Sequence, residues 1–229
     1  MFTGFTKETS DFLWELSFHN ERPWFLEHKE QFERCLNQPF KELARETYAL
    51  LCRRFPGLEC NVHVSRIYRD ARRLFGRGPY KDHLWFSIQC GDHNRGGPSF
   101  WFEIGAAEYT YGLGFWSERP ADMELYRRAI DANPARFERL VKPFAGAKDL
   151  RLFGQEYRRP KGDRGEILNP WYNRRSVGLE SVHDFGGDLL TPELPQILVD
   201  CYAKLMPLHD FFLEVRRASD AAGSEEPHG

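Results

Sequence analysis

Basic side chains are concentrated between residues 62 and 81, among segments with a strand-like pattern. This stretch holds five arginines and one lysine against one aspartate, a local net charge of +5 in a chain whose total is −2. Guanidinium groups present a planar fork of donors that matches phosphate or carboxylate oxygens in pairs. Gly76 and Gly78 allow backbone N–H groups to face an anion. The stretch therefore predicts a loop that binds something anionic, and it indicates no particular reaction.

Three arginines of this stretch, Arg66, Arg69 and Arg72, are spaced three residues apart. On an extended strand the first two would face opposite sides, so we expect the chain to turn near Tyr68 and the guanidinium groups to converge. Asp70 would orient one of them. The predicted ligand-binding residues of the stretch are Arg66, Arg69, Asp70, Arg72, Arg77, Tyr80 and Lys81.

The pattern favours binding more strongly than catalysis. Asp70 and His83 are weak candidates for an acid–base group, since histidine titrates near neutral pH. The sequence has no G-x-S-x-G, no P-loop and no G-x-G-x-x-G that opens a helix after a strand. Its cysteines and histidines lack metal-ligand spacing. We therefore predict neither a cofactor nor a metal, and whether the protein is an enzyme stays open.

Three interpretations of the basic stretch remain. In the first, it forms a pocket for a phosphorylated or otherwise anionic ligand. In the second, a hydrolase or transferase uses the same pocket on a phosphate-bearing substrate or a nucleic acid. In the third, the arginines form an internal salt-bridge network in a structural or interaction domain, with partners such as Asp11, Glu15 or Glu103. Burial of the arginine side chains distinguishes the third from the other two.

A second basic segment covers residues 158–175, with six basic and two acidic side chains. Because the chain totals −2 and the two windows carry +5 and +4, the remainder carries −11. Basic charge is thus confined to two segments on an acidic background, and these would form one patch if they met in space. Arg158 and Arg174 are candidate ligand-binding residues of this segment, and the alternative is that they are solvated loop charges.

The expected partner is an anionic small molecule or phosphate group. Nucleic acid is a further candidate, because Trp85 and Trp101 alternate opposite the apolar residues of their strands and could stack bases. No apolar run approaches the roughly 18 residues of a membrane span, and the first residues lack a signal-peptide pattern. We therefore expect no membrane partner and a cytoplasmic location. Five scattered cysteines make disulfides an unexpected feature.

Periodicity predicts helices first, then strands, then helices. Apolar residues at helical spacing, with Pro23 and Pro39 at helix starts, predict three helices in the first ~55 residues. A period of two then predicts strands, which are listed here by range: 62–67, 83–89, 99–104, 109–116 and 150–157. The later helices are predicted at 121–140, with a break at Pro134, and as a pair at 192–217.

The predicted fold class is α+β, because helices and strands are segregated along the sequence. We expect N-terminal helices, a central antiparallel sheet of about 4–6 strands, and C-terminal helices packed on the sheet. The 229 residues suit a single domain, residues 1–217, with a flexible C-terminal tail at 218–229.

The motif Arg66-x-x-Arg69-Asp70-x-Arg72, followed by Pro79-Tyr80-Lys81, resembles the signature of the uncharacterised bacterial family DUF2461. Further positions resemble that family in order along the chain: Asn20, Arg22, Trp24 and Phe25, then Gly112, Gly114 and Trp116, then Arg158, Arg159, Pro160, Gly162 and Arg174. The resemblance covers about residues 2 to 215. It implies a shared fold and candidate positions, and no activity.

The chain departs from the family pattern at three positions of the central motif. Arg73 stands where the pattern has Phe, Gly76 where it has Asp or Asn, and Arg77 where it has Lys. A function that requires the acidic side chain at position 76 is therefore not implied for this chain.

Overall fold

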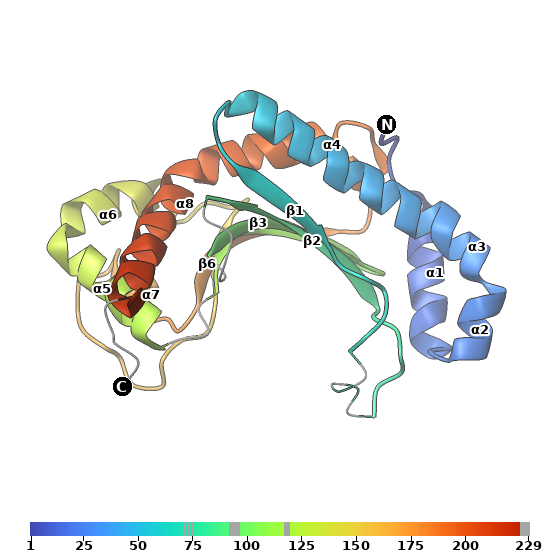
Figure 1. The fold of residues 1–229 in the computed structure, drawn as a ribbon, viewed down its shortest axis with the longest axis horizontal. Helices are drawn as coiled ribbons and strands as arrows, with labels where there is room; N and C mark the ends of the chain where they lie inside the picture. Colours follow the sequence, from blue (N-terminus) through green and yellow to red (C-terminus); the bar gives the residue numbers. More distant parts are fainter. Residues whose placement is uncertain (71, 73, 75, 92–96, 117–119, 225–229) are drawn as a thin grey trace. The chain divides into compact units, whose positions relative to one another are not determined.

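The computed structural model describes residues 1–70, 72, 74, 76–91, 97–116 and 120–224 (Figure 1). The first elements are α1 (Lys7–Phe18), α2 (Arg22–Glu27), α3 (Lys29–Phe32), a π-helical turn at Glu33–Asn37 and α4 (Gln38–Arg54). The strands β1 (Cys60–Val64), β2 (His83–Cys90), β3 (Pro98–Gly105) and β4 (Glu108–Phe115) follow. The last part holds α5 (Pro120–Ala132), α6 (Pro134–Val141), a 3-10 turn at Lys142–Phe144, β5 (Arg151–Phe153), α7 (Asn169–Tyr172), β6 (Val177–Asp184), a 3-10 turn at Gly187–Leu190 and α8 (Leu194–Ser224).

The six strands form one antiparallel sheet in the order β1-β2-β3-β4-β6-β5, with helices at both ends of the chain. The predicted α+β class is therefore confirmed. By its internal contacts the chain divides into two compact units. The first comprises residues 1–88, 101–111 and 182–201, and the second comprises residues 89–100, 112–181 and 202–229. The single domain with a C-terminal tail stays a prediction.

The core of the first unit lies between α4 and the sheet. Phe86 of β2 and Phe102 of β3 are fully buried, and Phe40 of α4 packs on both, with ring centroids 5.7 and 6.0 Å away. Figure 1 shows α4 running over β1 and β2. The period-two pattern predicted these inward positions, because alternate side chains of a strand share one face. Burial of Leu84 and Ile88 confirms it along the rest of β2.

The core of the second unit is aromatic and is built on α8. Phe212 stacks on Phe115 of β4 at 5.3 Å, and Phe211 packs on Phe137 of α6 at 4.7 Å. His209 is fully buried and stacks on Phe100 at 5.1 Å. Large aromatic rings bury 150–250 Å² each. The rings on α8 therefore contribute much of the apolar burial that holds these strands and α6 together.

The structure differs from the predicted elements in three respects: the start of one helix, one additional strand, and one helix in place of a pair. In the sequence, Thr9-Ser10-Asp11 is a helix start signal. Helix α1 instead begins at Lys7, because Thr6 occupies the N-cap and its N–H donates to Thr9 Oγ1 at 3.3 Å. Strand β6 was missed. The predicted helix pair at 192–217 is one helix, α8, with Pro207 inside it. Helix α8 includes the first residues of the predicted tail, and residues 225–229 lie outside the described part.

The expectation that disulfides are absent was wrong. Cys60 and Cys90 each belong to a disulfide, whereas Cys35, Cys52 and Cys201 are not disulfide-bonded. The expectation rested on scattered spacing along the chain, which carries no information on which cysteines meet after folding. Separately, none of the described helices has a segment both long and apolar enough to span a bilayer.

His209 predicts a pH-dependent stability. Burial lowers the pKa of His209 below its ordinary value of 6.5, against the opposite effect of Asp210, whose Oδ1 lies 3.2 Å from Nδ1. The unfolded state then binds a proton more readily than the folded state, so the stabilising contribution is complete above pH ~6.5 and is lost as the pH falls through the lower, folded-state pKa.

We expect His209→Gln to flatten the decline in stability between pH 7 and pH 5, by about 1.4 kcal/mol for each pKa unit that separates the two states. Urea unfolding at several pH values measures this slope. His63→Gln, at an exposed position of β1, is the matched control and should leave the slope as in the wild type. Equal slopes for all three proteins would contradict the prediction.

Candidate functional sites in the two basic segments

The first basic stretch folds back on itself at the end of β1. Tyr68 and Tyr80 form an antiparallel bridge. Beside it, the N–H of Arg69 donates to the carbonyl of Pro79 at 2.8 Å, and the N–H of Lys81 donates to the carbonyl of Ile67 at 2.7 Å. These backbone bonds close a loop whose two ends both belong to the predicted motif.

Tyr80 anchors this loop to the N-terminal helices. Its side chain is 2% exposed and stacks on Phe25 of α2 at 4.1 Å. The amide of Asn20 binds both backbone groups of Tyr80, accepting from the N–H and donating to the carbonyl, each at 2.9 Å. Burial raises the pKa of Tyr80. Gly78 is required here, because a Cβ at that position would overlap the side chain of Asn20.

Arg69 points into the loop and is only 14% exposed. Its Nε donates to the carbonyl of Tyr80 at 2.6 Å, and its Nη2 lies 3.3 Å from Asp82 Oδ1. Asp82 also contacts Nδ1 of His83 at 2.9 Å. Burial would raise the pKa of Asp82, but its contacts with His83 and Arg69 lower it overall. The carboxylate that contacts His83 is therefore Asp82, and the same carboxylate contacts Arg69.

The other basic residues of the stretch lie in different surroundings. Arg72 is 88% exposed and folds onto Asp70, with Nη2 2.8 Å from Oδ2. Lys81 donates from Nζ to the carbonyl of Arg66 at 2.7 Å, and burial lowers its pKa. Arg66 and Arg77 are exposed, and neither side chain has a hydrogen bond or ion pair with any residue that the structure describes.

One of the three departures from the resembled motif, Gly76, fits the backbone. Gly76 has φ +79°, in the left-handed region that glycine adopts freely and that Asn and Asp tolerate better than other residues. Glycine can therefore replace the family's Asp or Asn at this turn without backbone strain. Arg73 lies outside the described residues.

Arg69→Ala is expected to lower the free energy of unfolding by about 1.5–3 kcal/mol, because a guanidinium that donates to a buried carbonyl is lost. Urea unfolding measures the loss. Arg66→Ala is the matched control from the same loop and should change stability by less than ~0.5 kcal/mol, since the side chain is exposed. A loss for Arg69→Ala as small as that of the control would contradict a structural role.

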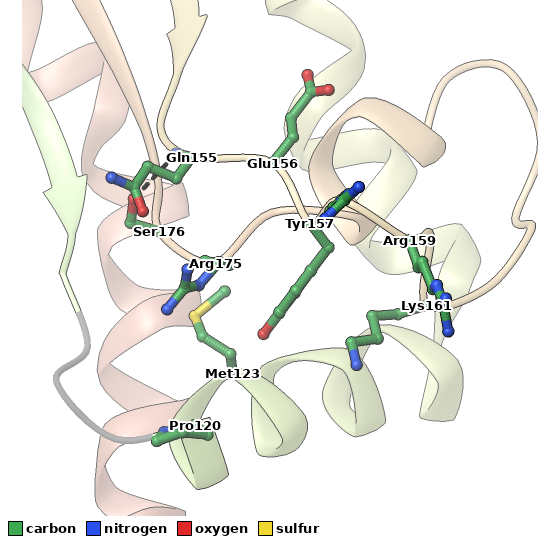
Figure 2. A pocket seen from close by; sticks show the side chains of 10 residues that line it. Pro120, Met123, Gln155, Glu156, Tyr157, Arg159, Lys161, Arg175 and Ser176 are labelled. Atoms are coloured by element: carbon green, nitrogen blue, oxygen red, sulfur yellow. Dashed lines mark hydrogen bonds between the residues drawn. The ribbon is translucent and has the colours of Figure 1, made fainter.

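The second basic segment lines a pocket of about 930 Å³ in the second unit (Figure 2). Its cationic side chains are Arg158, Arg159, Lys161 and Arg175. Glu156 is the carboxylate among the lining residues, and it is already paired with Arg174, with Nη2 3.0 Å from Oε1. The wall is therefore strongly cationic.

The apolar part of the pocket comes from α5 and from one aromatic ring. Met123 is 2% exposed, and Pro120 begins the same helix. Tyr157 lies among the cations: Lys161 Nζ is 4.8 Å from its ring centroid, and Arg127 Nη1 donates to its hydroxyl at 3.4 Å. Gln155 and Ser176 add polar groups to the lining of the pocket.

Arg174 supports the wall of the pocket from inside the protein. It is 12% exposed and uses three nitrogens: Nε donates to the carbonyl of Pro170 at 2.8 Å, Nη1 to the carbonyl of Gly154 at 2.5 Å, and Nη2 binds Glu156. Beyond it, Arg175 donates its N–H to the carbonyl of Gln155 at 2.6 Å. Arg174 thus holds the two chain segments on which the lining residues stand.

The loop at 158–165 is held by Asn173, by an ion pair of Arg164, and by Asn169, whose Oδ1 accepts from the N–H of Arg164 at 2.6 Å. Asn173 Oδ1 accepts from the N–H groups of Lys161, at 2.7 Å, and Gly162, at 3.3 Å. Arg164 binds Asp131 of α5 at 2.6 Å, and this hydrogen bond lowers the pKa of Asp131. The basic residues of the loop are therefore presented from a backbone that is fixed at both ends.

The predicted residues are distributed unevenly over these two places. Arg158 lines the pocket, and Arg174 supports it. Tyr157, Arg159, Lys161 and Arg175 line the pocket but were not in the predicted set. The charge of the segment was a sufficient signal for the cations among them. It could not tell Arg174 from Arg175, because adjacent residues of an extended chain face opposite sides.

Among the described residues, no group of three or more His, Cys, Asp or Glu side chains is placed to hold an ion.

Comparison with known proteins identifies the family. A model described as a conserved hypothetical protein, DUF2461, matches residues 8–211 of the 229. The chain belongs to the DUF2461 family, as the motif around Arg66 and the pieces before and after it predicted. No curated protein matches the chain.

Proposed function

We propose that this protein binds a phosphorylated or otherwise anionic ligand in the pocket of its second unit. One observation carries the proposal: four cationic side chains line the pocket, while its carboxylate, Glu156, is paired with Arg174. Arg158, Arg159 and Arg175 are exposed and have no side-chain hydrogen bond or ion pair within the described part of the chain. Cations in that state are available to an external anion.

The size and lining of the pocket support a small-molecule ligand. A volume of about 930 Å³ lies within the usual range of ligand sites, roughly 300–1,000 Å³. The exposed Pro120 and the half-buried Tyr157 offer an apolar surface beside the cations, so an organic anion would make contacts that an inorganic ion cannot. The rigid loop also lowers the conformational entropy that binding would cost.

For the first basic stretch, we infer that part of the motif stabilises the loop. The support comes from Arg69, whose guanidinium binds Tyr80 and Asp82 and is 14% exposed. Exposed Arg66 and Arg77 remain proposed anion contacts of that stretch.

Thermal unfolding of the intact protein with pyrophosphate, adenosine monophosphate and a sugar phosphate tests the proposal. A ligand at about 100 times its dissociation constant adds ~2.7 kcal/mol, a rise in Tm of a few degrees. We expect this rise in the wild type and its loss in a double variant, Arg159→Gln with Arg175→Gln.

Arg128→Gln is the matched control, because Arg128 is an exposed arginine on α5 that binds Glu124 and does not line the pocket. It should keep the ligand-dependent rise. The proposal is wrong if no anion raises the Tm of the wild type, or if the double variant responds like the control.

A further inference from the structure

We propose that the ligand carries two phosphate groups on separate hydroxyls of one sugar, as in a nucleoside 3′,5′-bisphosphate. This inference rests on the proposed function and specifies its ligand. The cations of the pocket are arranged in two groups that come from separate chain segments. Arg158, Arg159 and Lys161 belong to one loop, and Arg175 stands just before β6.

The two groups lie on either side of an apolar centre. Figure 2 shows Tyr157 between them, with Arg175 beside Met123 on one side and Lys161 with Arg159 on the other. A single compact anion would engage one group and leave the other without a counter-charge. An anion at each end satisfies both groups, since guanidinium and ammonium bind phosphate oxygens strongly through charge-assisted hydrogen bonds.

The spacing of the two groups is fixed by the fold. The N–H of Arg175 binds the carbonyl of Gln155 at 2.6 Å, and the N–H of Lys161 binds Asn173 Oδ1 at 2.7 Å. Tyr157 itself is tied to the same asparagine, because its N–H donates to the carbonyl of Asn173 at 2.9 Å. All three backbone positions therefore belong to one hydrogen-bonded framework.

The centre suits a nucleoside whose base is attached to the sugar that carries the phosphates. The half-buried ring of Tyr157 is held by Arg127, whose Nη1 lies 3.4 Å from its hydroxyl and whose Cζ lies 5.2 Å from its ring centroid, and Lys161 Nζ lies 4.8 Å from the same centroid. A nucleobase could contact this aromatic side chain and the cations around it.

Isothermal titration of the intact protein with four adenine nucleotides and inorganic phosphate tests the inference. Adenosine 3′,5′-bisphosphate and adenosine 5′-diphosphate are isomers with two phosphate groups: the first carries them on separate sugar hydroxyls, and the second carries them joined as a diphosphate at the 5′ position. We expect the separated isomer to bind at least tenfold more tightly than the diphosphate, the 5′-monophosphate or phosphate, because only it reaches both groups.

Variants assign the two ends. Arg175→Gln and Lys161→Gln should each weaken the 3′,5′-bisphosphate by roughly tenfold to a hundredfold, since each removes a contact to a charged group. Each variant should therefore bind the bisphosphate about as tightly as the wild type binds the monophosphate. Arg128→Gln should leave all affinities as in the wild type. Tyr157→Leu should reduce the preference for the nucleotides over base-free ribose 3,5-bisphosphate.

The fourth nucleotide is a single-stranded tetraadenylate, which contains the same unit within a nucleic acid. Tighter binding of the free bisphosphate indicates a small-molecule ligand, and tighter binding of the tetraadenylate indicates a nucleic acid. Diphosphate binding as tight as that of the 3′,5′-isomer would overturn the two-ended arrangement while leaving the anion pocket intact. Failure of every anion to bind would instead overturn the proposed function itself.

Discussion

Replacement of Asp122 by alanine is expected to lower the free energy of unfolding by about 1–3 kcal/mol, because it removes the acceptor of the buried Ser219 hydroxyl and one of the two carboxylates that bind Arg216. Asp122 is 1% exposed at the start of α5. Its Oδ2 accepts from Arg216 Nη1 of α8 at 3.4 Å, and its Oδ1 accepts from the hydroxyl of Ser219. Arg216 keeps its second carboxylate, Asp220, at 2.6 and 3.1 Å, but its side chain is 8% exposed, so water can replace little of the contact with Asp122.

Two comparisons give this prediction its meaning, and both use urea unfolding. Glu214→Ala removes the partner of Arg136 in another ion pair to α8, but one whose side chains are 43% and 53% exposed. That change should cost only about 0–1 kcal/mol. A double variant, Asp122→Leu with Arg216→Leu, should be less destabilised than Asp122→Ala, because apolar side chains then replace the buried carboxylate and the buried guanidinium together. Equal losses in the free energy of unfolding for Asp122→Ala and Glu214→Ala would contradict the prediction.

Gly154→Ala is expected to destabilise the protein by more than the ~1–3 kcal/mol that a strained backbone conformation costs alone. Gly154 has φ +119°, which L-residues rarely adopt. A Cβ there would also overlap the carbonyl oxygen of Ser176, a backbone atom that cannot move aside as a side chain could. Because Arg174 donates to the carbonyl of Gly154, the change should also displace the wall of the pocket.

The chain offers a matched control for this second prediction. Gly146 also has positive φ, +74°, but nothing lies within 4 Å of the position that a Cβ would take. Gly146→Ala therefore reports the conformational cost without the overlap. Denaturant unfolding should give a larger loss for Gly154→Ala, and thermal unfolding should show a smaller response to anions in that variant alone. A loss no larger than the control's would mean that the backbone at Ser176 yields easily.

The sequence by itself determined the elements whose signal is local. The alternation of Leu84, Phe86 and Ile88 was enough to place β2 and its buried face, because the pleat of a strand fixes side-chain direction every second residue. Pro39 similarly marked the start of α4 to within a residue or two. The motif beginning at Arg66 was sufficient for the family, since it is read directly from residue types and spacing.

Strand β6 shows where a local signal was present but weak. Val177 and Leu179 alternate with buried Gly178, and glycine is depleted in strands. Only the folded neighbours explain the glycine: a Cβ at residue 178 would overlap the carbonyl of Leu113 and the ring of Phe153. A contact with residues so distant in the sequence leaves no periodic trace, so the strand was overlooked.

The tertiary structure alone decided what each basic side chain does. Arg69 and Arg174 are internal because backbone carbonyls at Tyr80, Gly154 and Pro170 come within reach of them after folding. Arg175, next to one of them in sequence, faces the pocket instead. Composition fixes how many charges a segment carries. Which of them are satisfied depends on carbonyls and carboxylates brought together from far along the chain, and that choice is made by packing.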